Sequence, residues 1–292
     1  MSSGLVECVP NFSEGRDADV VSALAEAVRA APGVWLLDET ADPDHNRSVL
    51  TFAGQGEAVL EAAVRAARVA LEHIDLRSQT GVHPRIGAMD VLPFVPLEGA
   101  DMADCVALAE RAARRLWVEL GVPCYLYEAA ARLPERRNLA FVRSPAAGPP
   151  DVGQGRHASA GCTAVGARKV LIAYNVNLRT GDLAVARDIA RMVRERSGGL
   201  PCVKALGLPL ASRGQVQVSM NLTDYEVTPP HVAFLAVSGA AHARGVEVAG
   251  SELIGLLPAR ALELAAGVDL QWENFDESLV LETRIEQARR RA

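Results

Sequence analysis

Short apolar runs alternate with longer amphipathic segments along the first part of the chain. Residues 17–31 and 57–73 repeat their apolar positions with the period of a helix. Four other runs have the length and the flanking turns of strands, at 5–9, 34–38, 47–53 and 89–95. The resulting order, β-α-β-β-α-β, is the split βαβ pattern, in which two helices pack on one face of a small sheet.

The second half of the chain repeats this order. One helix is expected at 182–196, and a second begins near Thr228, which can cap it, with Pro229 in its first turn, and runs to about residue 244. Strands are expected at 170–176, 202–208, 215–222 and 246–249. We therefore predict an α+β fold of two related βαββαβ subdomains, ferredoxin-like in topology, covering residues 1–178 and 179–292.

Three further segments lie outside these repeats. A helix is expected at 102–120 and a strand at 124–127, and the Gly/Pro-rich residues 144–161 are expected to form an ordered loop or linker. The tail from residue 277 is expected to be a short charged helix.

Composition and charge exclude several classes of protein. Of the 292 residues 49% are hydrophobic, which is ample for a packed core, yet no run approaches the roughly 20 apolar residues of a membrane span. The first ten residues lack a secretory signal, so we expect a cytoplasmic protein. A net charge of −6 without a basic, aromatic-rich run argues against nucleic-acid binding. The five cysteines are widely spaced among apolar residues and favour buried free thiols over disulfides.

Common catalytic and cofactor motifs are missing from the sequence. The six histidines are scattered and there is no CxxC or HExxH, so we expect no metal cofactor. Ser13 does not lie in a G-x-S-x-G frame, so the sequence gives no support for nucleophilic catalysis. Gly153, Gly155 and Gly161 do not lie between a strand and a helix as a dinucleotide fingerprint would, so a nucleotide cradle is not expected.

The densest group of unusual residues is TGVHPRIG at 80–87, directly before an expected strand. His83 lies there in a Gly-flanked turn, and Pro84 restricts its backbone to an extended conformation. An imidazole at this place can take a proton from an attacking amine and deliver one to a leaving nitrogen. Spacing alone also fits a surface histidine with a local hydrogen bond. Arg85 either pairs with a substrate carboxylate or forms a structural salt bridge.

Other polar stretches also leave two interpretations open. In the turn 42–48, Asn46 and Arg47 either present an amide and a guanidinium to a cleft or serve the turn alone, and the second is favoured. Arg168 and Lys169 either hold an anion or lie in water. The basic stretch 132–143 has the same two interpretations, with a solvated face favoured.

Several long motifs together resemble the glutamate formiminotransferase family. The resemblance covers residues 5 to about 270, and a chance match over so many ordered segments is very improbable. The motifs are VECVPNFSEGR at 6–16, DHNRS at 44–48, GVHPRIGAMDV at 81–91, YLY at 125–127, GARKVLIAYNVNL at 166–178 and QVSMNL at 217–222.

This resemblance implies transfer of the formimino group of N-formimino-L-glutamate, an intermediate of histidine breakdown, to N5 of tetrahydrofolate. Tetrahydrofolate is then a co-substrate, bound in a groove between two α/β subdomains, and no metal is implied. The histidine of the family's HPR motif matches His83, which implies that it is the catalytic acid/base. Arg47 and Arg85 are then expected to hold the glutamate carboxylates. The family's folate-binding stretch matches Gly153, Gln154, Gly155, Arg156, His157, Ala158, Ser159, Ala160 and Gly161.

The sequence departs from the family pattern in two ways. Between Arg143 and Pro149 it is shorter than usual, and the folate stretch differs from that of relatives after Asp151. These two differences would change the lip of the folate pocket. A changed pocket lip keeps two alternatives open, a formyl transferase acting on 5-formyltetrahydrofolate and a folate-binding protein without catalysis. The second departure is that no cyclodeaminase domain is recognisable, so ring closure of the product would need a separate enzyme. Apolar surface on two subdomains allows a homodimer, which no motif specifies.

Overall fold

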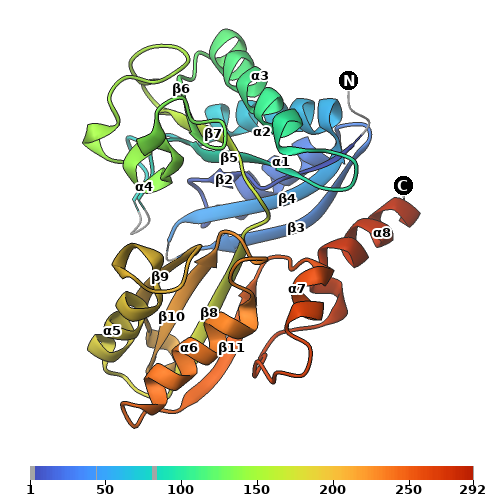
Figure 1. Cartoon of the computed structure of the whole chain (residues 1–292). Helices are drawn as coiled ribbons and strands as arrows, with labels where there is room; N and C mark the ends of the chain where they lie inside the picture. The colour runs from blue at the N-terminus through green and yellow to red at the C-terminus, as the bar shows by residue number, and fades with distance from the viewer. Residues whose placement is uncertain (1–3, 44, 81–83, 292) are drawn as a thin grey trace. The chain divides into compact units, whose positions relative to one another are not determined.

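A computed structural model of the chain describes residues 4–43, 45–80 and 84–291, which form a mixed α/β fold with two sheets (Figure 1). The chain divides into two compact units, residues 1–168 with 288–292, and residues 169–287. The division falls before strand β8 (Ile172–Leu178), whereas the sequence suggested a boundary after residue 178. β8 lies in the second unit because both of its neighbours, β10 (Gln215–Leu222) and β11 (Val248–Ile254), are strands of the second sheet.

The first sheet begins with the strands expected from the sequence. β3 (Val34–Asp42) pairs with β4 (Arg47–Gln55), β4 pairs with β1 (Leu5–Cys8), and β1 pairs with β5 (Met89–Pro96), all antiparallel. The short β2 (Asn11–Phe12) continues β1 between the same two neighbours. β5 is buried along nearly its whole length, as is typical of a strand covered on both faces.

Two more strands extend this sheet beyond the expected unit. β7 (Thr163–Ala167) is parallel to β5, and β6 (Cys124–Glu128) is parallel to β7. The sequence predicted β6 but missed β7, whose run TAVGA is fully buried and therefore shows no alternation of apolar and polar residues. The extension brings residues 153–162, which lead into β7, beside the start of β5.

Three helices share one hydrophobic core with the first sheet (Figure 1). They are α1 (Ala18–Arg29), α2 (Gly56–His73) and α3 (Met102–Leu120). The Asp17 side chain accepts hydrogen bonds at the start of α1, and a capping box formed by Asp101 and Asp104 starts α3. These caps satisfy backbone N–H groups that have no partner within the helix, and they fix where each helix begins.

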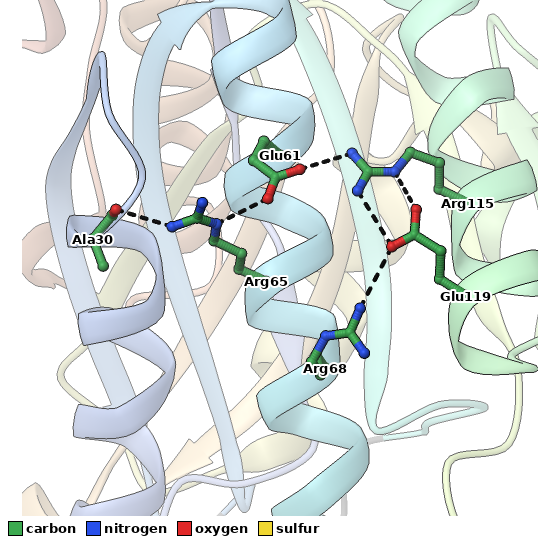
Figure 2. A network of polar contacts seen from close by, with 6 residues as sticks. All are labelled: Ala30, Glu61, Arg65, Arg68, Arg115 and Glu119. Atoms are coloured by element: carbon green, nitrogen blue, oxygen red, sulfur yellow. Dashed lines mark hydrogen bonds and ion pairs between the residues drawn. The ribbon is translucent and has the colours of Figure 1, made fainter.

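Ion pairs connect the outer faces of these helices (Figure 2). Glu61 on α2 accepts from Arg65, 2.9 Å away, and from Arg115 on α3, also at 2.9 Å. Arg115 also pairs with Glu119, which contacts Arg68 on α2. These side chains are partly exposed, so each pair contributes little to stability, on the order of 0.2–1 kcal/mol.

The opposite face of the first sheet is covered at the β5, β7 and β6 end by the segment 139–147. This segment contains the short helix α4 (Leu139–Val142) and a 3-10 turn at Pro145–Ala147. It encloses a small second core, whose members are Ile86, Val91, Tyr125, Tyr127, Val142, Ala147, Cys162 and Ala164.

The second unit runs strand, helix, strand, strand, helix, strand, with the sheet order β11-β8-β10-β9. Its elements include β9 (Val203–Leu210), α5 (Leu183–Val193) and α6 (Pro230–His242), and α7 (Ala259–Leu264) and α8 (Leu281–Arg291) follow β11. The neighbour order β9-β10-β8-β11 corresponds to β3-β4-β1-β5 of the first unit. Helices α5 and α6 contribute to one hydrophobic core with this sheet.

Two sequence-based details of the second unit were wrong. Thr228 does not cap α6, because its hydroxyl donates a hydrogen bond to the carbonyl of Pro201 at 2.6 Å, and Pro229 occupies the N-cap position. The last strand was expected at 246–249, but β11 begins later, at Val248, and continues to Ile254.

Two other sequence-based expectations concern cysteines and membrane spans. All five cysteines are free thiols, four of them buried, while Cys202 is partly exposed. Burial raises the pKa of Cys105 to about 12, helped by Asp104 and Asp101.

Among the described residues no helix has the length and apolarity that a bilayer crossing requires.

Candidate functional site

The three residues Ile86, Gly87 and Ala88, which follow the HPR motif, are held by hydrogen bonds to Asp90 and Ser13. Asp90 Oδ1 accepts hydrogen bonds from the backbone N–H of Ile86 at 2.6 Å and of Gly87 at 3.3 Å. The hydroxyl of Ser13 donates to the Gly87 carbonyl at 2.7 Å, and the Ser13 N–H donates to the Ala88 carbonyl at 2.8 Å. Ser13 therefore has a structural partner rather than a nucleophile's setting.

The expected folate stretch, 153–161, and the adjacent Cys162 form further hydrogen bonds with Ile86 and Ala88. The carbonyl of Ile86 accepts from the Cys162 N–H at 2.8 Å and from the Arg156 guanidinium at 3.0 Å. The Ala88 N–H donates to the carbonyl of Ala160 at 2.9 Å. With these bonds, every backbone N–H and C=O from Ile86 to Ala88 has a partner, so this short segment is rigidly placed.

Residues 153–161 form a compact turn around His157. The backbone of His157 exchanges two hydrogen bonds with Gly161, and its ring Nδ1 accepts from the N–H of Ala160 at 3.1 Å. The His157 ring therefore stabilises this turn through the hydrogen bond at Nδ1. Gln154, Arg156 and Ala158 are exposed, which leaves them accessible to a ligand.

The turn at 42–48 is joined to the same region by Asn46. Its amide oxygen accepts from the Gly15 N–H at 2.9 Å, and its amide nitrogen donates to the Thr80 carbonyl at 3.0 Å and to the side chain of Gln79. Asn46 is buried and has a positive φ of 48°, a conformation that asparagine tolerates better than most residues. It therefore fastens three segments together, which is more than the turn-only role favoured from the sequence.

Glu14 completes this network from within the motif NFSEG. One oxygen accepts from the N–H groups of Gly15, Arg16 and Asp17 at 2.8–3.0 Å, and the other accepts from the Gln79 amide at 2.6 Å. Burial alone would raise the pKa of Glu14, but the hydrogen bonds to its charged form outweigh burial and lower the pKa below its usual value.

Arg47 and Arg85, the two candidate carboxylate-binding arginines, both lie next to these hydrogen-bonded segments. Arg47 is half-buried at the start of β4, where burial first and the charge of Arg143 next lower its pKa, against the opposing effect of Asp90 and Asp42. The Arg85 guanidinium donates a hydrogen bond to the carbonyl of His45 at 3.0 Å. The structure thus brings Arg47, Arg85 and the turn 153–161 to one region of the first unit.

His83, the predicted catalytic residue, lies outside the described residues. The described chain resumes at Pro84, and from there the motif leads directly into the hydrogen-bonded segment at Ile86.

The basic stretch 132–143 is not a uniformly solvated face, contrary to the favoured interpretation. Arg136 is 3% exposed and pairs with the buried Asp151 at 2.6 Å. It also donates to the carbonyls of Ala147 and Pro149, at 2.7 and 2.6 Å. Arg136 therefore holds residues 147–151, which directly precede the folate stretch, in place. Lys169, by contrast, is half-exposed and pairs with Asp224 at 2.7 Å.

Sequence reasoning missed Asp90 and Arg143, which form a largely buried ion pair. The signal for Asp90 was present, since a carboxylate within the apolar run MDVLPFV has to find a partner if the strand is buried. For Arg143 there was no comparable signal, because an arginine in a charged stretch is usually solvated. Within the part of the chain described by the structure, no three His, Cys, Asp or Glu side chains gather as metal ligands would.

Two family models match this chain, one in each compact unit. The family model of the formiminotransferase domain's N-terminal subdomain matches residues 5–168, and that of the formiminotransferase domain matches residues 173–287. The chain is 42% identical to a glutamate formimidoyltransferase of Thermoplasma acidophilum, over 97% of this chain and 98% of that protein. It is 43% identical to a glutamate formimidoyltransferase of Streptococcus pyogenes serotype M1, over 93% of this chain and 95% of that protein.

A longer relative is the formimidoyltransferase-cyclodeaminase of Rattus norvegicus, which is 43% identical over 90% of this chain. The match covers 52% of that protein, so this chain spans about half of its length. Since the two family models together match most of the sequence and the relatives match along nearly all of it, the chain belongs to the formiminotransferase family.

Proposed function

We propose that this protein transfers the formimino group of N-formimino-L-glutamate to N5 of tetrahydrofolate, releasing L-glutamate and 5-formiminotetrahydrofolate. The observation that carries the proposal is the identity of 42–43% to two glutamate formimidoyltransferases over nearly the full length of each. The geometry supports it, because the expected folate stretch is hydrogen-bonded to the segment that follows the HPR motif.

The reaction requires one proton to move between two nitrogens. N5 of tetrahydrofolate attacks the amidine carbon, and a tetrahedral intermediate forms. His83 accepts the proton that N5 loses and gives it to the glutamate nitrogen, whose bond to the carbon then breaks. Positioning both substrates in one site converts an encounter of two molecules into a step within a complex.

Arg47 and Arg85 are proposed to bind the glutamate carboxylates. A carboxylate beside Arg47 would offset the cost of its burial and the repulsion from Arg143, both of which lower its pKa. The exposed Arg156 and Gln154 are proposed to bind tetrahydrofolate, together with the backbone of the turn 153–161.

Two finer structural points belong to the same proposal. The shared neighbour order of four strands in the two units supports related ferredoxin-like subdomains, one N-terminal and one C-terminal. Assembly as a homodimer stays a prediction, which light scattering of the purified protein would check.

The test incubates purified protein with formiminoglutamate and tetrahydrofolate, quenches with acid, and follows the near-ultraviolet absorbance of the methenyl product. We expect His83→Ala to lose about 10²- to 10⁴-fold in kcat, as is usual when an acid/base group is removed. His242→Ala, at an exposed position of the second unit, is the matched control and should keep wild-type turnover. Folate binding without turnover by the wild type would favour the carrier alternative, and turnover with a formyl donor alone would favour the formyl transferase.

A further inference from the structure

Asp90 is a buried carboxylate in a strand that otherwise consists of apolar residues. It is 3% exposed, between Met89 and Val91 in β5. A buried charge is costly unless hydrogen bonds or an opposite charge compensate it. Asp90 has both, and its two oxygens bind different parts of the unit.

One oxygen, Oδ1, accepts the N–H groups of Ile86 and Gly87 at 2.6 and 3.3 Å. These residues lie directly after Pro84 and Arg85, so Asp90 fixes the direction in which the chain runs back from β5 to Arg85. Backbone N–H bonds to a carboxylate are charge-assisted and stronger than those to a neutral acceptor.

The other oxygen, Oδ2, accepts from the guanidinium of Arg143, the residue that ends α4. The Arg143 side chain is 16% exposed and is close enough to Arg47 to lower the pKa of that arginine. Asp90 therefore links three features of the site: the backbone after the HPR motif, the segment 139–147, and the charge around Arg47.

We propose that Asp90 is a positioning residue for the transfer reaction, and that Arg143 holds its carboxylate in place. The inference rests on the proposed function and adds a residue pair to it. Neither side chain has to touch the reacting atoms, because the effect passes through the backbone of Ile86 and Gly87 to the motif that contains His83. A displacement of about 1 Å in a catalytic arrangement can cost roughly 100-fold in rate.

The test compares Asp90→Asn with a matched control in the second unit, Asp224→Asn. The Asp224 side chain is 17% exposed, pairs with Lys169 at 2.7 Å and accepts the backbone N–H of Glu226 at 3.2 Å. We expect Asp90→Asn to lower kcat roughly 10- to 100-fold, with KM for both substrates within about threefold of wild type. Asp224→Asn also removes a charged hydrogen-bond acceptor and should lower thermal stability, while kcat stays within about twofold.

Arg143→Lys and Arg143→Gln give a second test in case Asp90→Asn does not fold. Lysine keeps the positive charge beside Asp90 and should retain more of kcat than glutamine does. Wild-type kcat in Asp90→Asn, an equal fall of kcat in Asp224→Asn, or no difference between the two Arg143 variants would overturn the positioning role. Absence of turnover in the wild type would instead refute the proposed function, so the two failures are distinguishable.

Discussion

Gly87 and Gly161 pair across an antiparallel bridge in which each backbone fills the space that the other's side chain would need. A Cβ on Gly87 would lie 2.1 Å from the carbonyl oxygen of Cys162, and a Cβ on Gly161 would lie 2.1 Å from that of Ile86. Both contacts are with backbone atoms, which have little freedom to move. The close approach of the two segments therefore depends on glycine at both positions.

Replacing Gly161 with alanine should separate the folate stretch from the segment after the HPR motif. Gly161 has a positive φ of 69°, so alanine there is strained in addition to clashing, whereas Gly155 has a φ of 66° and open space around it. Gly155→Ala should cost about 1–2 kcal/mol from strain alone, and Gly161→Ala clearly more. Denaturant unfolding measures both, and equal losses would contradict the close-approach argument.

Removal of Arg136 should destabilise the first unit strongly. Arg136→Met leaves Asp151 buried at 6% side-chain exposure without its partner, a situation that typically costs 3–5 kcal/mol, here taken as about 4 kcal/mol. The control is Arg111→Met, which breaks an ion pair with Glu57 in which both side chains are nearly half exposed, and should cost about 1 kcal/mol or less. A comparable fall in the free energy of unfolding for both variants would refute this difference.

The lowered pKa of Glu14 predicts a specific dependence of stability on pH. A carboxyl group whose pKa is lower in the folded state stabilises the fold above its unfolded pKa, here about 4.5, and loses this contribution as pH falls through the lower folded value. Glu14→Gln should therefore be less stable than wild type at pH 7, and the gap should shrink below about pH 4.5. Urea unfolding of both proteins from pH 7 to pH 3 would show it, and a gap that is constant with pH would contradict it.

The proposed carboxylate ligands are tested by Arg47→Met and Arg85→Met. A charge-assisted hydrogen bond contributes about 1.5–3 kcal/mol, so each variant should raise KM for formiminoglutamate roughly 10- to 100-fold, with a smaller effect on KM for tetrahydrofolate. Arg29→Met is the control. Arg29 is half-exposed, lies outside the family motifs and pairs with Glu26 and Glu39. An unchanged KM for formiminoglutamate in either variant would remove that arginine from the assignment.

The sequence by itself determined the elements whose pattern is local. The apolar stripe of α1 and the helical period of α3 depend on residues a few positions apart, and the structure confirms both helices. The family was also available from the sequence, because motifs such as NFSEG and GVHPRIG are long enough to be specific without coordinates. The order of strands and helices, which repeats along the chain, also predicted two α/β halves.

Only the tertiary structure decided which distant segments meet. Strand β7 was missed because a strand buried on both faces has no alternating pattern, and Thr228 was misassigned because its partner, the carbonyl of Pro201, lies 27 positions away. The same applies to Asp90 and Arg143, 53 positions apart. Burial and pairing across such separations depend on the packing of the whole unit, so a local pattern carries no record of them.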